Sequence, residues 1–312
     1  MRSNPADYAL TAPPTLAAAL TALAADPTLT PIAGGTELMV ALSAGRLPQK
    51  NLLSINHLKA LRFIEVTPDA VTLGAGATFT DIRRHPTLAA HFPLLVQAAS
   101  WLGSIANQNR ATLGGNIVNA SPAADSPPAL LVYDAQLTLI SAGPAGEMTT
   151  RTLPYTGFHL GYKRTALHPG ELLYSITLPR AFAGYRSYIR KVGTRNAQAI
   201  SKVALACLAR MAPNPASSAH AAAGPSSPPA RLITDIRIAA ASLREVPTRL
   251  PAAEQALLNQ PLTPQTLPAL IASAHAAIAS EVRPIDDIRS TARYRAAVAA
   301  NLLEEFLRGL AS

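Results

Sequence analysis

A polar stretch in the middle of the chain constrains its fold more than any other feature. Residues 107–125, NQNRATLGGNIVNASPAAD, are rich in Asn, Gly, Ser and Pro, yet they lie between two apolar segments. Loops of this length inside a compact domain are uncommon and usually carry a function, because their backbone polar groups need partners. We therefore expect an ordered, polar-lined loop that takes part in a binding site.

A glycine pair precedes this stretch, in the segment PIAGGTEL at residues 31–38. The pattern predicts a strand that runs through Gly34 and Gly35 into a helix. Successive glycines let main-chain N–H groups turn toward one point, and a helix N-terminus adds partial positive charge, so the turn can hold a pyrophosphate. The same pattern also occurs in ordinary turns, and it lacks the G-x-G-x-x-G of a dinucleotide-binding fold.

A second glycine pair, Gly114-Gly115, lies inside the polar stretch and is followed by Asn116, Asn119 and Asp125. Glycine permits close approach of the backbone to a ligand, and short polar side chains supply partners for hydroxyls and phosphates. Asp125 can accept hydrogen bonds from sugar-alcohol hydroxyls. The alternative is a structural loop whose side chains satisfy its own backbone.

The rest of the sequence predicts a mixed helix and strand fold in two domains, since 312 residues exceed the size at which one hydrophobic core stops growing. In the first part we expect helices at residues 14–25, 92–102 and 127–133 and strands at 29–33, 51–55, 61–66, 70–73, 136–140, 148–152 and 171–178. In the second part we expect strands at 185–192, 203–211 and 232–240 and helices at 251–258, 263–279 and 291–310. Residues 213–230, rich in Pro, Ala, Ser and Gly, are expected to form a mobile surface loop.

The charge distribution argues against a nucleic-acid partner, although the net charge is +9. Between residues 162 and 202 there are eight basic residues and one acidic residue, Glu171, so this segment carries +7 and the rest is nearly balanced. A local positive region suits a phosphate-bearing cofactor or an acidic partner surface, and a solvated basic face is the alternative. No apolar run is long enough for a membrane span, and residues 15–25 favour an amphipathic helix over a signal peptide, so we expect a cytoplasmic protein.

The chain has one cysteine, Cys207, in an apolar run where a buried, inert thiol is expected. Iron-sulfur clusters of the common types need four cysteine ligands, so this chain alone cannot hold one. The seven histidines show no metal-ligand spacing, and we predict no metal site. Any redox chemistry here must use an organic cofactor or the metals of a partner.

Four segments together resemble a known family: PIAGGTEL, RATLGGNIVNASPAADSPPALL, FHLGYKRTALHPGELL and RKVGTRNAQAISKV. They are similar to the FAD-binding subunits and domains of xanthine dehydrogenase and carbon monoxide dehydrogenase, in order and over nearly the whole chain. The 22-residue match at residues 110–131 is the most specific. The resemblance implies an α+β fold, with a two-lobed FAD-binding domain of the p-cresol methylhydroxylase type at residues 1–180 (lobes about 1–55 and 56–180). A smaller α+β domain with a three-stranded antiparallel sheet and helices would follow at residues 184–312.

The same resemblance implies roles for individual residues. Residues 33–38 and 112–116 correspond to the two loops that bind the FAD pyrophosphate, Asp125 to a residue on the ribityl or pyrophosphate portion, and Lys191 to a positive residue at the cofactor. Leu173 corresponds to an apolar contact, while Leu102 stands where xanthine dehydrogenases often carry an aromatic residue, so it departs from their ring-stacking pattern. The predicted cofactor-binding residues are Ile32, Ala33, Gly34, Gly35, Thr36, Glu37, Leu38, Leu102, Thr112, Gly114, Gly115, Asn116, Asp125, Leu173 and Lys191.

No residue is predicted with certainty to be catalytic. Tyr162, in Gly161-Tyr162-Lys163-Arg164, resembles an aromatic residue at the flavin face, although an aromatic flanked by basic residues is also typical of a surface anchor. Residues 192–202 resemble a loop that controls access to that face. Gln198 and Ala199 stand where NAD-using relatives carry acidic residues, which leaves the acceptor open.

The function implied by the resemblance is electron transfer. A molybdopterin subunit would hydroxylate the organic substrate, a subunit with 2Fe-2S clusters would pass the electrons to FAD on this chain, and NAD or another acceptor would receive them. A flavin-free assembly scaffold and a self-sufficient flavin oxidase are the alternatives. The organic substrate is chosen by the molybdenum subunit, and this sequence does not indicate which one it is.

Overall fold

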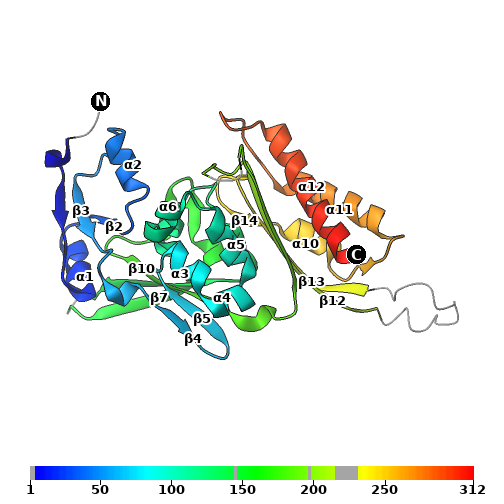
Figure 1. Ribbon diagram of the computed structural model, residues 1–312, viewed down its shortest axis with the longest axis horizontal. Coiled ribbons are helices and arrows are strands. Elements are labelled where there is room, and N and C mark those ends of the chain that lie inside the picture. The colour runs from blue at the N-terminus through cyan, green and yellow to red at the C-terminus, as the bar shows by residue number, and fades with distance from the viewer. Residues whose placement is uncertain (1–3, 144–145, 196–197, 215–230) are drawn as a thin grey trace. The chain divides into compact units, whose positions relative to one another are not determined.

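The computed structural model describes residues 4–143, 146–195, 198–214 and 231–312. The chain forms two compact units (Figure 1). Unit 1 comprises Met1–Ser121 and Tyr133–Ala181, and unit 2 comprises Pro122–Val132 and Phe182–Ser312. Residues 107–121 of the polar stretch therefore belong to unit 1, and residues 122–125, with the segment up to Val132, belong to unit 2. Most of the surface loop predicted at residues 213–230 lies outside the described residues.

The first lobe of unit 1 is a small three-stranded parallel sheet, in the order β1-β3-β2. Its strands are β1 (Ala9–Thr11), β2 (Thr30–Ile32) and β3 (Asn51–Ser54), and its helices are α1 (Leu16–Ala25) and α2 (Leu38–Ser43). Helix α1 is capped by Thr15, whose hydroxyl accepts from Ala18 N, and it buries Leu16, Ala19, Leu20 and Leu23. Strand β2, the glycine pair and α2 form the strand-turn-helix arrangement that the sequence predicts.

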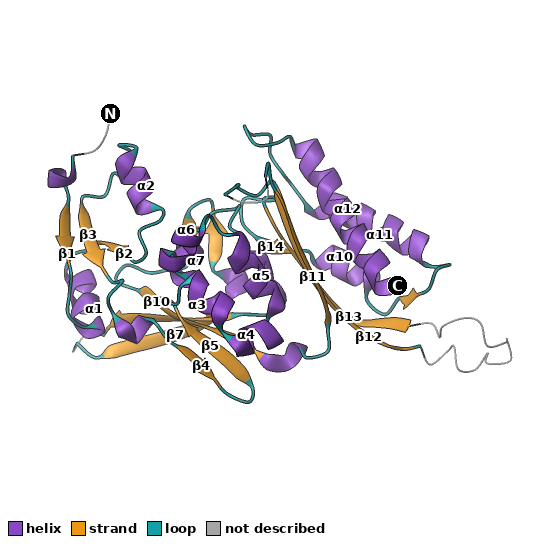
Figure 2. Cartoon of the chain, viewed as in Figure 1, coloured by secondary structure: helices purple, strands orange, loops and turns teal. Residues whose placement is uncertain are grey.

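A five-stranded antiparallel sheet forms the second lobe of unit 1, in the order β4-β5-β10-β6-β7. Figure 2 labels β4, β5, β7 and β10 of this sheet. Its strands are β4 (Ile64–Val66), β5 (Ala70–Gly74), β6 (Gln136–Ala142), β7 (Met148–Pro154) and β10 (Leu172–Pro179). Val71 and Leu73 of β5 and Ile176 and Leu178 of β10 are fully buried, as alternation along half-buried strands predicts. The helices are α3 (Phe79–Arg84), α4 (Pro86–His91), α5 (Pro93–Trp101), α6 (Ile105–Arg110) and α7 (Leu113–Val118), and β8 (His159–Gly161) and β9 (Arg164–Thr165) form a separate hairpin.

The loop predicted at residues 107–125 is the main correction, because α6 and α7 make most of its first half helical. Ser104 and Asn107 form a capping box at the start of α6, and the Thr112 hydroxyl accepts from Gly115 N at the start of α7. These caps compensate for the low helix propensity of Asn and Gly, and burial of Leu113 and Ile117 adds tertiary stabilisation.

Unit 2 contains an antiparallel sheet in the order β11-β12-β13-β14, with β15 paired to β13. The three long strands, β11 (Arg186–Val192), β12 (Val203–Pro213) and β13 (Arg231–Ala241), are those predicted, and β14 (Thr248–Arg249) and β15 (Pro261–Leu262) are short additions. The helices are α8 (Pro127–Val132), α10 (Pro251–Leu257), α11 (Leu267–Glu281) and α12 (Ala292–Ala311).

The central strand β12 is buried on both faces. Val203, Leu205, Cys207 and Ala209 join the core that α10, α11 and α12 complete, while α8 packs against β12 and β13. This explains why residues 203–209 are a continuous apolar run instead of an alternating one. Cys207 is fully buried, and that burial raises the pKa of its thiol well above the usual value, as expected for an inert cysteine.

Candidate functional site

The first glycine pair leaves a row of main-chain donors open. Gly35 has a φ of +77°, a conformation that side chains disfavour, and the chain turns there from β2 into α2. The N–H groups of residues 34–38 donate to no other described residue, and the first donor of α2 to pair is Met39 N, at 2.9 Å from Gly35 O. Five successive unpaired N–H groups in a half-buried turn suit anionic oxygens such as those of a pyrophosphate.

The two glycine segments lie against each other in unit 1. A Cβ atom added to Gly34 would lie 1.8 Å from the carbonyl oxygen of Arg110 and 2.5 Å from its carbonyl carbon. Arg110 ends α6 and stands two residues before Thr112. Glycine at position 34 is therefore required by backbone-to-backbone contact, and that contact brings together segments about 80 residues apart in sequence.

The second glycine pair has a different role, because its N–H groups bind the protein itself. Leu113 N donates to Ala77 O and Gly114 N to Ala75 O, both at 2.9 Å, and Gly115 N donates to the Thr112 hydroxyl at 3.1 Å. A Cβ atom on Gly114 would lie 2.6 Å from the Cβ of Ala75. The second pair thus allows α7 to pack on the end of β5, and the first pair supplies the open donors.

We expect Thr112→Val to weaken both the fold and ligand binding, because it removes the hydroxyl that caps α7. The free energy of unfolding should fall by about 1 kcal/mol, the usual value of such a cap. Thr15→Val removes the equivalent cap of α1 and should lower stability by a similar amount without changing affinity for a phosphate-bearing ligand. Equal ligand affinity in the two variants would mean that the Thr112 cap is only structural; Thr112→Ser should restore both properties.

A hairpin brings a lysine and a tyrosine to the same region. Lys163, in the turn between β8 and β9, donates from Nζ to Asn119 Oδ1 at 2.6 Å and lies 3.5 Å from Glu37 Oε1. It therefore links the first glycine segment to the residues that follow α7. Tyr162 is its neighbour in the turn and has 62% of its surface exposed. The bridging role of Lys163 is absent from the predicted site, and the only sequence signal for it was its place in the basic segment.

Two apolar residues, Leu173 and Leu102, were also predicted to belong to the cofactor site. Leu173 is buried in β10, next to Tyr174, whose carbonyl accepts from Ala75 N at 2.8 Å. The Ala75 carbonyl in turn accepts from Gly114 N. Leu173 is therefore the sequence neighbour of Tyr174, which binds the residue that holds Gly114. Leu102 directly follows α5 and is half-buried, and within the described ranges no hydrogen bond joins it to either glycine pair.

Asn116 lies in α7, where its N–H donates to Thr112 O at 3.0 Å. Two further predicted residues, Asp125 and Lys191, meet in unit 2. Lys191 Nζ donates to Asp125 Oδ2 at 2.6 Å, and the Ser201 hydroxyl donates to Asp125 Oδ1 at 2.6 Å. Both charged side chains are about one-tenth exposed. Burial raises the pKa of the Asp125 carboxyl, while the Lys191 charge and the two hydrogen bonds oppose that shift. Ser201 was missed from sequence, where a lone serine before an apolar strand carries no signal.

The segment expected to control access, residues 192–202, connects β11 to β12. Its ends are held together by a hydrogen bond of 2.8 Å from Lys202 N to Val192 O. Residues 196 and 197 lie outside the described residues. Access control by this segment stays a prediction.

The described residues contain neither a candidate membrane span nor a candidate metal site. No helix among them is long and apolar enough to cross a membrane. No group of three or more His, Cys, Asp or Glu side chains in the described part of the chain could hold a metal ion.

Comparison with known proteins gives consistent similarities over both units. Residues 6–181 match the family described as the FAD binding domain in molybdopterin dehydrogenase, and residues 186–310 match the CO dehydrogenase flavoprotein C-terminal domain. The putative xanthine dehydrogenase FAD-binding subunit of Escherichia coli strain K12 is 30% identical over 285 residues, which cover 90% of this chain and 88% of that protein.

The carbon monoxide dehydrogenase medium chain of Hydrogenophaga pseudoflava is 28% identical over 281 residues, covering 88% of this chain and 87% of the relative. A solved structure of carbon monoxide dehydrogenase from the same organism, which lacks the Mo-pyranopterin moiety of the molybdenum cofactor, superposes with a TM-score of 0.82 at 25% identity. That superposition covers 98% of this chain and 96% of the other.

Proposed function

This chain belongs to the family of FAD-binding subunits of the molybdopterin dehydrogenases, and from that membership we propose that it transfers electrons within a xanthine dehydrogenase-type molybdenum hydroxylase. FAD, when bound, takes up electrons and passes them on, which the side chains of this protein cannot do themselves. The contribution of the chain is to bind the cofactor, orient it and set the charge around it. We propose that residues 1–180 form the FAD-binding domain and that residues 184–312 form a C-terminal domain of the CO dehydrogenase flavoprotein type.

The observation that best supports FAD binding is the row of unpaired N–H groups at residues 34–38. These donors, with the Thr36 hydroxyl, suit the oxygens of the FAD pyrophosphate. The segment at residues 112–116 fits as the wall beside them, since its own N–H groups are already bound within the protein. Asp125 and Lys191 together offer an acceptor and a cation, which suit hydroxyl and phosphate groups respectively.

The electron source would be a partner protein. With one buried cysteine, the chain cannot ligate a 2Fe-2S cluster, so we propose a separate iron-sulfur subunit and a molybdopterin subunit. The exposed Tyr162 is our candidate for the residue at the flavin face, where NAD or another acceptor would arrive. We propose that the complex is cytoplasmic.

The experiment that tests this function uses the purified full-length chain. It should bind FAD, measured by quenching of flavin fluorescence, and should show negligible oxidation of xanthine or aldehydes. Turnover should appear only when the iron-sulfur and molybdopterin subunits are added. Substrate turnover by the chain alone would indicate a self-sufficient oxidase, and assembly with both subunits without FAD binding would indicate a scaffold.

A further inference from the structure

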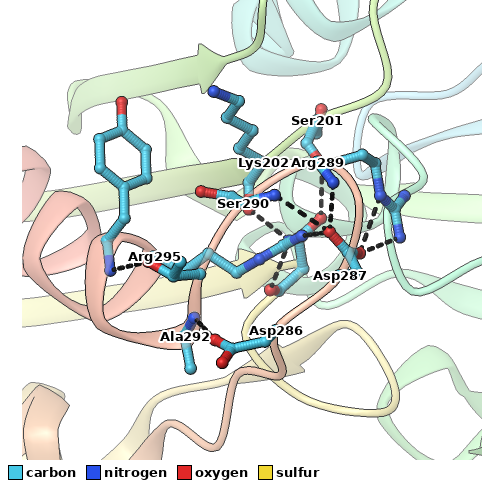
Figure 3. A network of polar contacts seen from close by, with 11 residues as sticks. Ser201, Lys202, Asp286, Asp287, Arg289, Ser290, Ala292 and Arg295 are labelled. Carbon is cyan, nitrogen blue, oxygen red and sulfur yellow. Dashed lines mark hydrogen bonds and ion pairs between the residues drawn. The ribbon is translucent and has the colours of Figure 1, made fainter.

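An arginine at the start of α12 is buried in unit 2, although charged side chains are rarely buried unless they are paired. Arg295 is 2% exposed. One terminal nitrogen, Nη1, donates to Lys202 O at 2.8 Å, and the other, Nη2, donates to Asp287 Oδ1 at 2.6 Å (Figure 3). Nη1 also lies 3.4 Å from Ser242 O. One planar group thus holds two main-chain carbonyls and one carboxylate.

The carboxylate partner is itself held firmly. Asp287 accepts from Arg289 N at 2.8 Å, from the Arg289 side chain at 2.6 Å and from Ser290 N at 3.1 Å (Figure 3). Burial alone would raise the pKa of the Asp287 carboxyl, but the Arg289 and Ser290 hydrogen bonds and the Arg295 charge keep that pKa below its usual range. Asp287 therefore stays ionised at neutral pH, and Arg295 has a fixed counter-charge.

The two carbonyls that Arg295 holds lead to the Asp125–Lys191 pair. Lys202 O follows Ser201, whose hydroxyl donates to Asp125. The Ser242 hydroxyl donates to Ser201 O at 3.1 Å, and Ser242 N donates to Pro122 O at 2.8 Å. Arg295 is thus connected to Asp125 from both sides: through Ser201, which binds the carboxylate, and through Pro122, three residues before it.

The backbone at Ser242 supports the same interpretation. Its φ is +68°, a conformation that a non-glycine residue adopts only where its surroundings hold it. The contacts that hold it are the bonds to Pro122, Ser201 and Arg295. A lysine at position 295 would offer a point charge in place of a planar group and could not match the same set of acceptors.

We propose that Arg295 and Asp287 are positioning residues for the cofactor site, which fix Ser201 and Pro122 and thereby set the geometry of the Asp125–Lys191 pair. Arg295 acts through these residues and makes no contact with FAD of its own in this scheme. The inference rests on the proposed function in one respect, namely that the Asp125–Lys191 pair contacts FAD.

The first test needs no cofactor. In the full-length chain without FAD, Arg295→Met should speed hydrogen exchange at the Ser242 and Lys202 amides, and Arg295→Lys should do so to a smaller extent. Arg308→Met, on the exposed end of the same helix, is the control and should leave both amides unchanged. Unchanged exchange at Ser242 and Lys202 in Arg295→Met would overturn the positioning role, whether or not the protein binds FAD.

The second test measures coupling to the cofactor. Arg295→Met should lower FAD affinity about tenfold, the effect of roughly one charge-assisted hydrogen bond, and should change the visible circular dichroism of bound FAD. In an Asp125→Asn background the same substitution should change FAD affinity less than about twofold, because the residue through which it acts is already altered. An equal loss in both backgrounds would mean that Arg295 only stabilises the fold. Failure of the wild-type chain to bind FAD would contradict the proposed function, while the exchange result would still decide the positioning role.

Discussion

Substitution of Gly34 by alanine should lower FAD affinity by about a hundredfold, which corresponds to roughly 3 kcal/mol. The added Cβ would overlap the carbonyl of Arg110, and neither backbone segment can yield as a flexible side chain would. Relief of that overlap must separate the turn at residues 34–38 from the end of α6, and this displaces the row of open N–H groups. Overpacking of this kind costs about 1–3 kcal/mol, occasionally more, so the fold should survive.

Isothermal titration with FAD measures the effect, and circular dichroism reports whether the chain is folded. Gly157→Ala is the matched control in the same unit, because nothing lies within 4 Å of a Cβ atom at that position. It should bind FAD like the wild type. Wild-type affinity in a folded Gly34→Ala variant would rule out the turn as the pyrophosphate site.

Asp125→Asn should be the second large effect, because it removes the carboxylate that pairs with the buried Lys191 ammonium at 2.6 Å. Removal of one partner of a buried pair costs roughly 3–5 kcal/mol, and the lower end is expected here, since both side chains are about one-tenth exposed. FAD affinity should fall as well, because the carboxylate that accepts from Lys191 and Ser201 is lost. Chemical denaturation and FAD titration measure the two effects.

A second substitution separates the charge from the ligand contact. In Asp125→Asn/Lys191→Met the buried lysine charge is removed together with the carboxylate, so stability should recover in part while FAD affinity stays low. Glu305→Gln breaks the neighbouring ion pair with Arg190, in which both side chains are at least half exposed, and should cost less than about 1 kcal/mol. If Asp125→Asn lowered the free energy of unfolding and the FAD affinity no more than Glu305→Gln does, the Asp125–Lys191 pair would contribute little to stability or to FAD binding.

Local signals in the sequence predicted the strands well. The hairpin of β4 and β5 turns at Thr67-Pro68-Asp69, where Thr67 and Ala70 exchange hydrogen bonds, and the apolar runs of β11, β12 and β13 predicted those strands to within two residues. Helix α11 begins at Leu267 instead of residue 263, because Thr263 and Thr266 bond to each other and delay it. Strand β1 was missed: its three residues are all exposed, so they show no burial pattern.

The candidate site was predictable in its parts but not in its connections. Resemblance to the family predicted Asp125 and Lys191 as site residues, yet nothing in the sequence indicates that these two residues, 66 positions apart, form an ion pair. Nor does it indicate that the Ser201 hydroxyl donates to Asp125. The open donors at residues 34–38 follow from glycine and helix geometry, whereas the inward bonds of the second glycine pair depend on where β5 lies. The role of Arg295 was not predicted from the sequence, because an arginine near the start of a helix is ordinarily exposed to solvent.

The position of α8 in the chain limits how segments of two relatives can be joined into one hybrid protein. It lies in the chain between two stretches of unit 1, yet it packs on the sheet of unit 2, with all six of its residues buried. The two units are therefore joined by three covalent crossings, and a cut after residue 181 does not separate them as blocks. A hybrid assembled from two relatives at that point would place the α8 of one parent on the β12 and β13 of the other. Exchange of the second unit between relatives thus requires transfer of Pro122–Val132 together with it.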